Sequence, residues 1–146
     1  MDNADLTPTN SAAQPEPLVL LVEDDQPLRE SLQMVLEAFG FHVAAAENGR
    51  AGLEAVATEH PAVIVTDLHM PELDGFELMT ALRKAGSDIP IIAISGGSST
   101  RTNSLLHCAK TFGAAAVFEK PFSPLELIDA ITALPAFAAP RLAAAH

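Results

Sequence analysis

The sequence has a single cysteine, Cys108, so no disulfide can form within the chain. It also lacks any uninterrupted apolar run of about 18 residues, which excludes a membrane-spanning helix. The first residues are acidic, whereas a secretory signal starts with basic residues and continues with an apolar stretch. We therefore expect a soluble, cytoplasmic protein that does not associate with membranes.

Basic residues are scarce as well. Eight Lys and Arg residues stand against 19 Asp and Glu residues, which gives a formal net charge of −11. This charge repels the phosphate backbone of nucleic acids, so direct DNA binding is not expected. The 146 residues suffice for one domain with a buried core and are too few for a second domain of ordinary size, so we expect no fused output domain.

The two ends of the chain differ in composition from its middle. Prolines at positions 8, 15 and 17, without hydrophobic periodicity, predict a disordered leader over residues 1–16. The folded domain is predicted over residues 17–134. Residues 135–146 are predicted to form a tail, in which Phe137 and Leu142 could dock on the domain surface.

Short apolar runs that alternate with amphipathic stretches predict five β-strands, over residues 18–22, 43–46, 62–66, 89–94 and 115–118. The first, third and fourth runs are apolar throughout, which is typical of strands buried on both faces at the centre of a parallel sheet. Five β-then-α units predict an α/β fold. We expect a flavodoxin-like, doubly wound (βα)5 parallel sheet of five strands in the order 2-1-3-4-5.

Helix boundaries support this assignment independently of the apolar pattern. Gly40, Gly86 and Gly113 each follow an apolar-periodic segment and precede a strand, where a left-handed glycine ends a helix without a steric penalty. Capping boxes are predicted at two helix starts, formed by Ser123 with Glu126 and by Asp74 with Glu77.

Carboxylates follow two of the predicted central strands. The first strand runs into Glu23, Asp24 and Asp25, and the third runs into Asp67. In a doubly wound sheet, ligands bind outside the carboxyl ends of the strands. Because clustered acids repel one another, such a cluster is tolerated when a hard divalent cation occupies it, and Mg²⁺ suits carboxylates that also face a phosphate.

A hydroxyl and an ammonium group are predicted at the same edge, because the fourth strand ends at Ser95 and the fifth is followed by Lys120. A carboxylate can attack a phosphoryl group, a metal and Lys120 can neutralise the phosphoryl oxygens, and Ser95 can donate a hydrogen bond to them. The pattern therefore indicates a metal-assisted phosphoryl site with Asp67 as the nucleophile.

From about Leu18 to Leu134 the sequence resembles the receiver domains of two-component response regulators. Four ordered motifs at predicted strand ends carry this resemblance: Leu21-Val22-Glu23-Asp24-Asp25, Asp67-Leu68-His69-Met70-Pro71-Glu72-Leu73-Asp74-Gly75, Ile94-Ser95-Gly96 and Glu119-Lys120-Pro121-Phe122. The resemblance implies a stand-alone receiver in two-component or phosphorelay signalling. A histidine kinase or a histidine phosphotransfer protein would donate the phosphoryl group to Asp67.

The resemblance also implies a Mg²⁺ site, formed by Glu23, Asp24, Asp67 and the backbone carbonyl of His69, and a cis peptide bond before Pro121. Asp25 is ambiguous: capping of the following helix explains it as well as metal binding does. The His69 side chain is expected either to lie close to the phosphoryl group or to be an exposed loop residue. If it lies close, His69→Ala should alter the lifetime of the phosphoryl group.

Two features depart from the family pattern. Receiver domains commonly have an aromatic residue three positions before the conserved lysine, and this position holds Val117. Phe118 is predicted to point to the opposite face of its strand, so it cannot replace that aromatic. The segment after Ser95 is a few residues longer than usual and starts with Gly96 to Thr102. We expect signalling through this segment and through the face formed by the helix after it, the last strand and the last helix.

Three functions compete. The first is a receiver that acts as a switch rather than as a metabolic enzyme, either relaying its phosphoryl group or binding an unidentified protein target. The second is an aspartate-nucleophile phosphohydrolase, which resembles a pattern with a second Asp two residues after the first, where this chain has His69. The third is a flavin-binding module, whose phosphate Glu23, Asp24 and Asp25 would repel. We favour the first.

Overall fold

The computed structural model describes residues 16–70, 73–96, 107, 109–111 and 113–137. Almost all of the predicted leader, the tail beyond Phe137 with Leu142, Cys108, and most of the segment after Ser95 lie outside the described residues. None of the helices within the described part of the chain is long and apolar enough to cross a bilayer.

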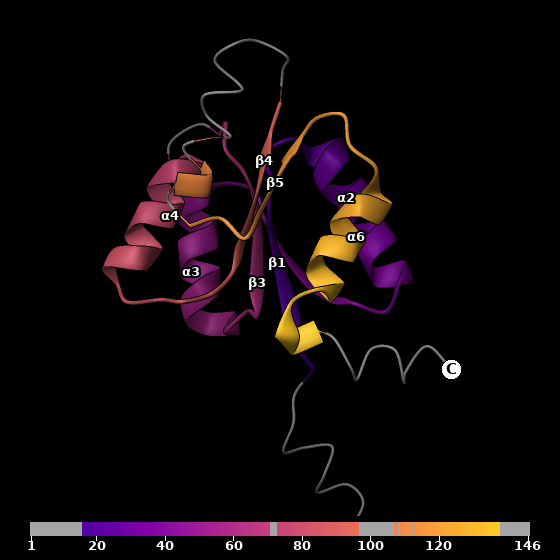
Figure 1. Cartoon of the computed structure of the whole chain (residues 1–146), viewed down its shortest axis with the longest axis horizontal. Helices are drawn as coiled ribbons and strands as arrows, with labels where there is room; N and C mark the ends of the chain where they lie inside the picture. The colour runs from indigo at the N-terminus through magenta and orange to yellow at the C-terminus, as the bar shows by residue number, and fades with distance from the viewer. Residues whose placement is uncertain (1–15, 71–72, 97–106, 108, 112, 138–146) are drawn as a thin grey trace, which may run out of the picture.

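Five parallel strands form one sheet in the order β2-β1-β3-β4-β5, which confirms the predicted topology (Figure 1). The strands are β1 (Leu18–Val22), β2 (His42–Ala46), β3 (Val63–Asp67), β4 (Ile91–Ser95) and β5 (Ala116–Glu119). All residues of β3 and β4 are buried, whereas β2 and β5 are partly exposed. The apolar runs therefore identified the central strands correctly.

Helices cover both faces of the sheet (Figure 1). On one face, α2 (Gln26–Ala38) and α6 (Pro124–Thr132) pack over alternate strand residues such as Leu21 and Val65. On the other face, α3 (Gly49–Glu59) and α4 (Gly75–Lys84) pack over the intervening residues, such as Leu20 and Ile64. His107 and residues 109–111 are also helical, and Ala109 is buried on the α3 and α4 face. The period of two along each strand thus divides the apolar side chains into two core layers.

Most of the predicted helix boundaries are confirmed. Gly40, Gly86 and Gly113 have φ angles of 93°, 84° and 95°, the left-handed conformation expected after a helix. The capping box of Asp74 and Glu77 is complete, with both hydrogen bonds at 2.9 Å. The box predicted for Ser123 and Glu126 is wrong, because the Ser123 hydroxyl instead accepts the backbone N–H of Leu125, at 3.2 Å.

The fourth strand begins at Ile91 rather than at residue 89 as predicted. In the preceding segment, the Arg83 guanidinium donates hydrogen bonds of 3.0 Å to the carbonyl oxygens of Ser87 and Ile89. The Ile89 N–H is directed to the Ser87 hydroxyl, and Pro90 has no N–H to contribute. These contacts could not be read from hydrophobicity alone.

The chain continues past Leu134 into a short 3₁₀ helix, η2 (Pro135–Phe137). Phe137 is 1% exposed and belongs to the core layer beneath α2 and α6. Its ring lies 5.9 Å from that of Phe41 in a tilted arrangement. Phe137 therefore docks, as the sequence allowed, and the packed part of the fold extends three residues beyond the predicted boundary of 134.

Replacing Phe137 by alanine should lower the free energy of unfolding by about 3–5 kcal/mol, because it removes a buried aromatic ring and leaves a cavity. Phe39→Ala is the matched control, since Phe39 is 50% exposed. Urea unfolding followed by far-ultraviolet circular dichroism measures both variants. Equal stability of the two variants would show that residues 135–137 are not part of the cooperative fold.

Candidate functional site

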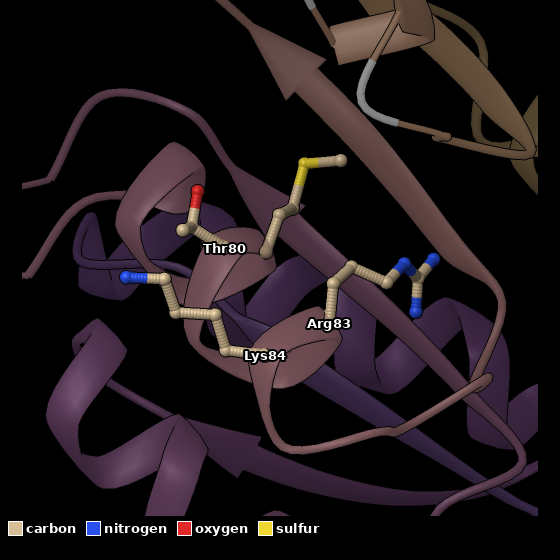
Figure 2. Close-up of a pocket in the computed structure, with 4 residues that line it drawn as sticks. Thr80, Arg83 and Lys84 are labelled. Carbon is tan, nitrogen blue, oxygen red and sulfur yellow. The ribbon is translucent and has the colours of Figure 1, made fainter.

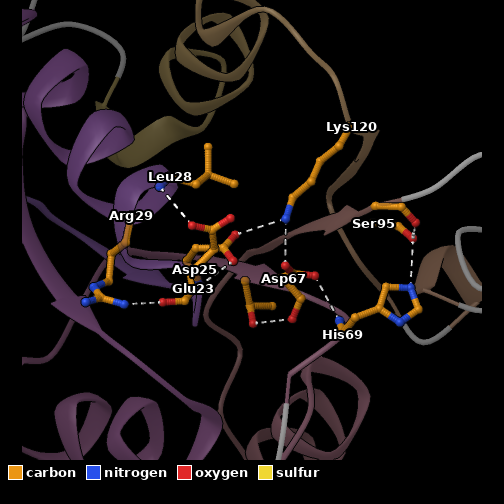
Figure 3. A network of polar contacts seen from close by, with 10 residues as sticks. Glu23, Asp25, Leu28, Arg29, Asp67, His69, Ser95 and Lys120 are labelled. Atoms are coloured by element: carbon orange, nitrogen blue, oxygen red, sulfur yellow. Dashed lines mark hydrogen bonds and ion pairs between the residues drawn. The ribbon is translucent and has the colours of Figure 1, made fainter.

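The carboxyl edge of the sheet brings together the side chains that the sequence singled out (Figure 3). Asp67 and Ser95 are the last residues of β3 and β4, and Glu23 and Lys120 directly follow β1 and β5. Main-chain hydrogen bonds continue the ladder into this edge, at 3.0 Å from Glu23 N–H to the Ala46 carbonyl and at 2.7 Å from Lys120 N–H to the Ser95 carbonyl. The sheet itself therefore positions the site.

Three carboxylates meet at this edge. Glu23, Asp24 and Asp67 each present an oxygen, and these oxygens lie within 4.8 Å of one another. Glu23 and Asp67 are buried, and Asp24 is exposed. The predicted juxtaposition of the first and third strand ends is thus present in the structure, with one acid open to solvent.

Lys120 compensates part of this negative charge. Its Nζ donates a 2.8 Å hydrogen bond to Oδ2 of Asp67 and lies 3.4 Å from Oε1 of Glu23. Burial acts to lower the pKa of Lys120, but the hydrogen bond and charge of Asp67, together with the charge of Glu23, outweigh it and raise the pKa. Lys120 is therefore a firmly charged ammonium group. The peptide bond that follows it, before Pro121, is cis, as the resemblance implied.

Of the two buried acids, Glu23 has the less compensated charge, because Lys120 lies 3.4 Å from Glu23 and 2.8 Å from Asp67. Burial, and then the charge of Asp67, raise its pKa from 4.5 to about 7. Among the described residues, its Oε1 is buried without a hydrogen-bond partner. A buried carboxylate oxygen that accepts no hydrogen bond and faces two other acids is suited to a hard divalent cation. The donor set of this edge thus fits Mg²⁺.

Helix α2 holds the acidic loop in place. Asp25 is its N-cap and accepts the Leu28 N–H at 3.3 Å, while the Asp25 N–H donates to Oε2 of Glu23 at 3.1 Å. Arg29 donates a 2.8 Å hydrogen bond from NH1 to the Glu23 carbonyl. The capping interpretation of Asp25 is therefore confirmed. Sequence reasoning missed Arg29, since an arginine one turn into a helix gives no sign of which carbonyl it reaches.

His69 contacts both the Asp67 carboxylate and the Ser95 hydroxyl. Its backbone N–H donates to Oδ1 of Asp67 at 2.8 Å, and its ring Nε2 lies 3.2 Å from Oγ of Ser95. The side chain is exposed, yet it reaches into the site, so both of the expected descriptions apply. That its backbone carbonyl is a metal ligand stays a prediction.

Gly75, at the start of α4, lies against the end of β3. A Cβ at this position would be 2.5 Å from the Asp67 carbonyl oxygen and 2.8 Å from Cα of Leu68. Only glycine lets the helix approach the strand this closely. The capping box at Asp74 thus starts a helix whose first residue packs directly under Asp67, in agreement with the structural role predicted for Asp74.

Val117 and Phe118 lie on opposite faces of β5, as predicted. Val117 packs on the α3 and α4 layer, whereas Phe118 packs on the α2 and α6 layer. Phe118 stacks on Phe122, with ring centroids 5.8 Å apart. Phe118 therefore does not occupy the position of the missing aromatic residue.

Two hollows help to delimit the site. One, of about 350 Å³, is lined by Leu68, His69, Met70 and Asp74 and adjoins the acidic edge. Another, of about 290 Å³, lies on α4 and is lined by Met79, Thr80, Arg83 and Lys84 (Figure 2). Neither hollow is lined by Glu23, Asp24 or Asp67, but the first is lined by His69, which contacts both Asp67 and Ser95.

The sequence profile of the response regulator receiver domain matches residues 19–132. The chain belongs to this family. It is thus a receiver domain of two-component signalling, as the four motifs predicted.

The response regulator MprA of Mycobacterium leprae is 37% identical over 116 residues, which cover 80% of this chain and 50% of that protein. MprA of Mycolicibacterium vanbaalenii is 35% identical over 116 residues, with coverages of 80% and 49%. The chain spans about half the length of these curated relatives.

Solved structures agree with this assignment. The crystal structure of FixJ-N superposes with a TM-score of 0.72 at 33% identity, covering 81% of this chain and 92% of that chain. The receiver domain of the Francisella response regulator 1452 superposes with a TM-score of 0.74 at 31% identity, covering 81% and 95%. The fold of this chain is therefore shared with these solved structures.

The raised pKa of Glu23 predicts a pH dependence of stability in the absence of metal. The folded protein keeps this proton to a higher pH than the unfolded chain does, so Glu23 contributes stability at low pH that is lost as pH rises from 4.5 to about 7. The urea concentration at the midpoint of unfolding is measured in EDTA at about pH 5 and about pH 8. Between these two pH values it should fall less for Glu23→Gln than for the wild type. Glu54→Gln, at an exposed position on α3, should behave like the wild type. An equal change of the midpoint with pH in the wild type and in Glu23→Gln would contradict the raised pKa of Glu23.

Proposed function

We propose that this receiver domain accepts a phosphoryl group on Asp67 with the help of Mg²⁺, and that it acts as a switch rather than as a metabolic enzyme. One observation carries the proposal: the Asp67 carboxylate, buried at the end of a central strand, lies beside the Lys120 ammonium at 2.8 Å and near two further acids. Asp67 thus combines a nucleophilic oxygen with groups that can stabilise transferred charge.

The proposed reaction consumes a phosphoryl donor in its first step and water in its second. An oxygen of Asp67 attacks phosphorus, the bond from phosphorus to the donor breaks with its electron pair leaving on the donor, and an acyl phosphate forms. Attack of water on phosphorus later releases inorganic phosphate and restores the carboxylate. Lys120 is already paired with Asp67 and can follow the negative charge onto the phosphoryl oxygens.

Glu23, Asp24 and Asp67 would hold the magnesium ion, with the His69 carbonyl as a further oxygen ligand. When bound, Mg²⁺ would offset the charge of the phosphoryl oxygens. The bound cation would favour the ionised form of Glu23 and so lower its raised pKa. The hydrogen bonds from Asp25 and Arg29 would keep the oxygens of Glu23 and the loop in place.

Ser95 would report the modification, because its hydroxyl lies on the strand next to β3 and can turn to the new oxygens. In a two-component pathway, the proposed donor is a phosphohistidine on a histidine kinase or on a phosphotransfer protein. The outcome is either onward transfer or binding of a protein target through the face around β5. A phosphohydrolase remains disfavoured, since His69 stands where the pattern of those enzymes has its second acid.

Acetyl phosphate with Mg²⁺ should add the mass of one phosphoryl group to the wild type, as measured by intact mass spectrometry. The Asp67→Asn variant should remain unmodified, because an amide cannot form the acyl phosphate. Addition of EDTA should abolish the adduct in the wild type. An unmodified wild type, or an adduct that survives in Asp67→Asn, would refute the proposal.

Asp24→Asn should weaken Mg²⁺ binding severalfold, because it replaces a charged ligand with a neutral one. Asp25→Asn is the matched control: asparagine caps a helix as well as aspartate does, and Asp25 is not among the clustered acids. Titration of ¹⁵N-labelled protein with MgCl₂, followed through backbone amide shifts, compares the two variants. Equal losses of affinity would show that net charge, rather than direct ligation, governs binding.

A further inference from the structure

We propose that the His69 side chain acts as a latch on Ser95, which keeps the serine hydroxyl engaged while Asp67 is unmodified and so opposes capture of a phosphoryl group. The inference rests on the proposed function. It assigns His69 the role of a positioning residue that acts through Ser95, rather than that of a shield that keeps water from the phosphoryl group.

The hydroxyl that should respond to phosphorylation is already occupied. The Nε2 of His69 lies 3.2 Å from Oγ of Ser95, within hydrogen-bond distance for either ring tautomer (Figure 3). Ser95 itself is fully buried at the end of β4. Its other contact within the described residues is the Gly96 carbonyl at 3.5 Å, which is at the limit for a hydrogen bond. The imidazole is therefore the better of these two partners.

The latch is anchored to the carboxylate that would be modified. Oδ1 of Asp67 accepts a hydrogen bond from the His69 backbone N–H at 2.8 Å, and Oδ2 accepts one from Nζ of Lys120. A phosphoryl group on Asp67 changes the charge and geometry of both oxygens, and it offers Ser95 new acceptors. Phosphorylation of Asp67 would therefore disturb the hydrogen bond that holds the His69 backbone. It would also compete with the His69 ring for the Ser95 hydroxyl.

His69 and Ser95 differ in what breaking the contact between them costs. His69 is exposed, so its ring exchanges the Ser95 contact for water when the latch opens. Ser95 is buried, so its hydroxyl needs a protein or phosphoryl partner in either state. Removing the imidazole penalises only the unmodified state. The affinity for a phosphoryl mimic should then rise by about two- to tenfold, the range of one ordinary hydrogen bond.

A double-mutant cycle with beryllofluoride and Mg²⁺ tests the latch. The affinity of the full chain for beryllofluoride is measured from backbone amide shifts for the wild type, His69→Ala, Ser95→Ala and the double variant. We expect tighter binding for His69→Ala and no effect of that substitution in the Ser95→Ala background. His42→Ala, which removes an exposed imidazole at the start of β2, is the matched control and should bind like the wild type.

The remaining outcomes separate the two proposals. No beryllofluoride binding by the wild type would overturn the proposed function itself. Wild-type binding with unchanged or weaker binding by His69→Ala would overturn the latch alone. An effect of His69→Ala that persists without the Ser95 hydroxyl would show that the ring acts on the phosphoryl site directly, and would also overturn the latch.

Discussion

Mutual repulsion of the carboxylates at the edge of the sheet is the constraint on which the rest of this site depends. Glu23, Asp24 and Asp67 present oxygens within 4.8 Å of one another, and two of the three residues are buried. Lys120 supplies one positive charge, bonded to Asp67, and Glu23 keeps an oxygen without a hydrogen bond and a raised pKa. Such an edge is stable only if the surrounding fold prevents the acids from moving apart. Buried central strands, the close approach of Gly75 to β3 and the α2 contacts to the acidic loop all oppose that movement.

Much of this arrangement could be predicted from the sequence, because it follows from local rules. Unbroken apolar runs predicted β1, β3 and β4 at the centre, and parallel strands bring their carboxyl ends to one edge. The juxtaposition of Glu23, Asp67, Ser95 and Lys120 then follows from topology alone. The caps at Asp25 and Asp74 follow from residue type and spacing.

The features that the sequence did not predict depend on where long side chains end. Arg29 and Arg83 reach backbone carbonyls six residues away, and the rotamers that direct them there leave no trace in hydrophobic periodicity. The same is true of the His69 ring, which could equally have pointed to solvent. For Phe137 the sequence allowed docking but did not decide it, because the residue lies beyond the last apolar-periodic helix; its ring packs against Phe41 and the layer beneath α2 and α6. The Ser123 cap differs from the predicted box by one residue, a choice that the motif alone does not decide.

The site has two sides with different freedom to move. On the β1 side, Glu23 is held by its bonds from Asp25 and Arg29, so this side is suited to fixed binding of a cation. On the β4 side, Ser95 has one good side-chain contact, to an exposed histidine, so this side is suited to change. If Asp67 is phosphorylated as proposed, the modification adds only about one negative charge by analogy with other phosphoresidues, so the proposed response is one of geometry. Val117, paired with Ala93 on the adjacent strand, lies on the α3 and α4 layer without the bulk of an aromatic ring. A turn of Ser95 would therefore be transmitted by the backbone of β4 and β5, which are joined by the 2.7 Å bond from Lys120 to Ser95, rather than by rotation of a large side chain at position 117.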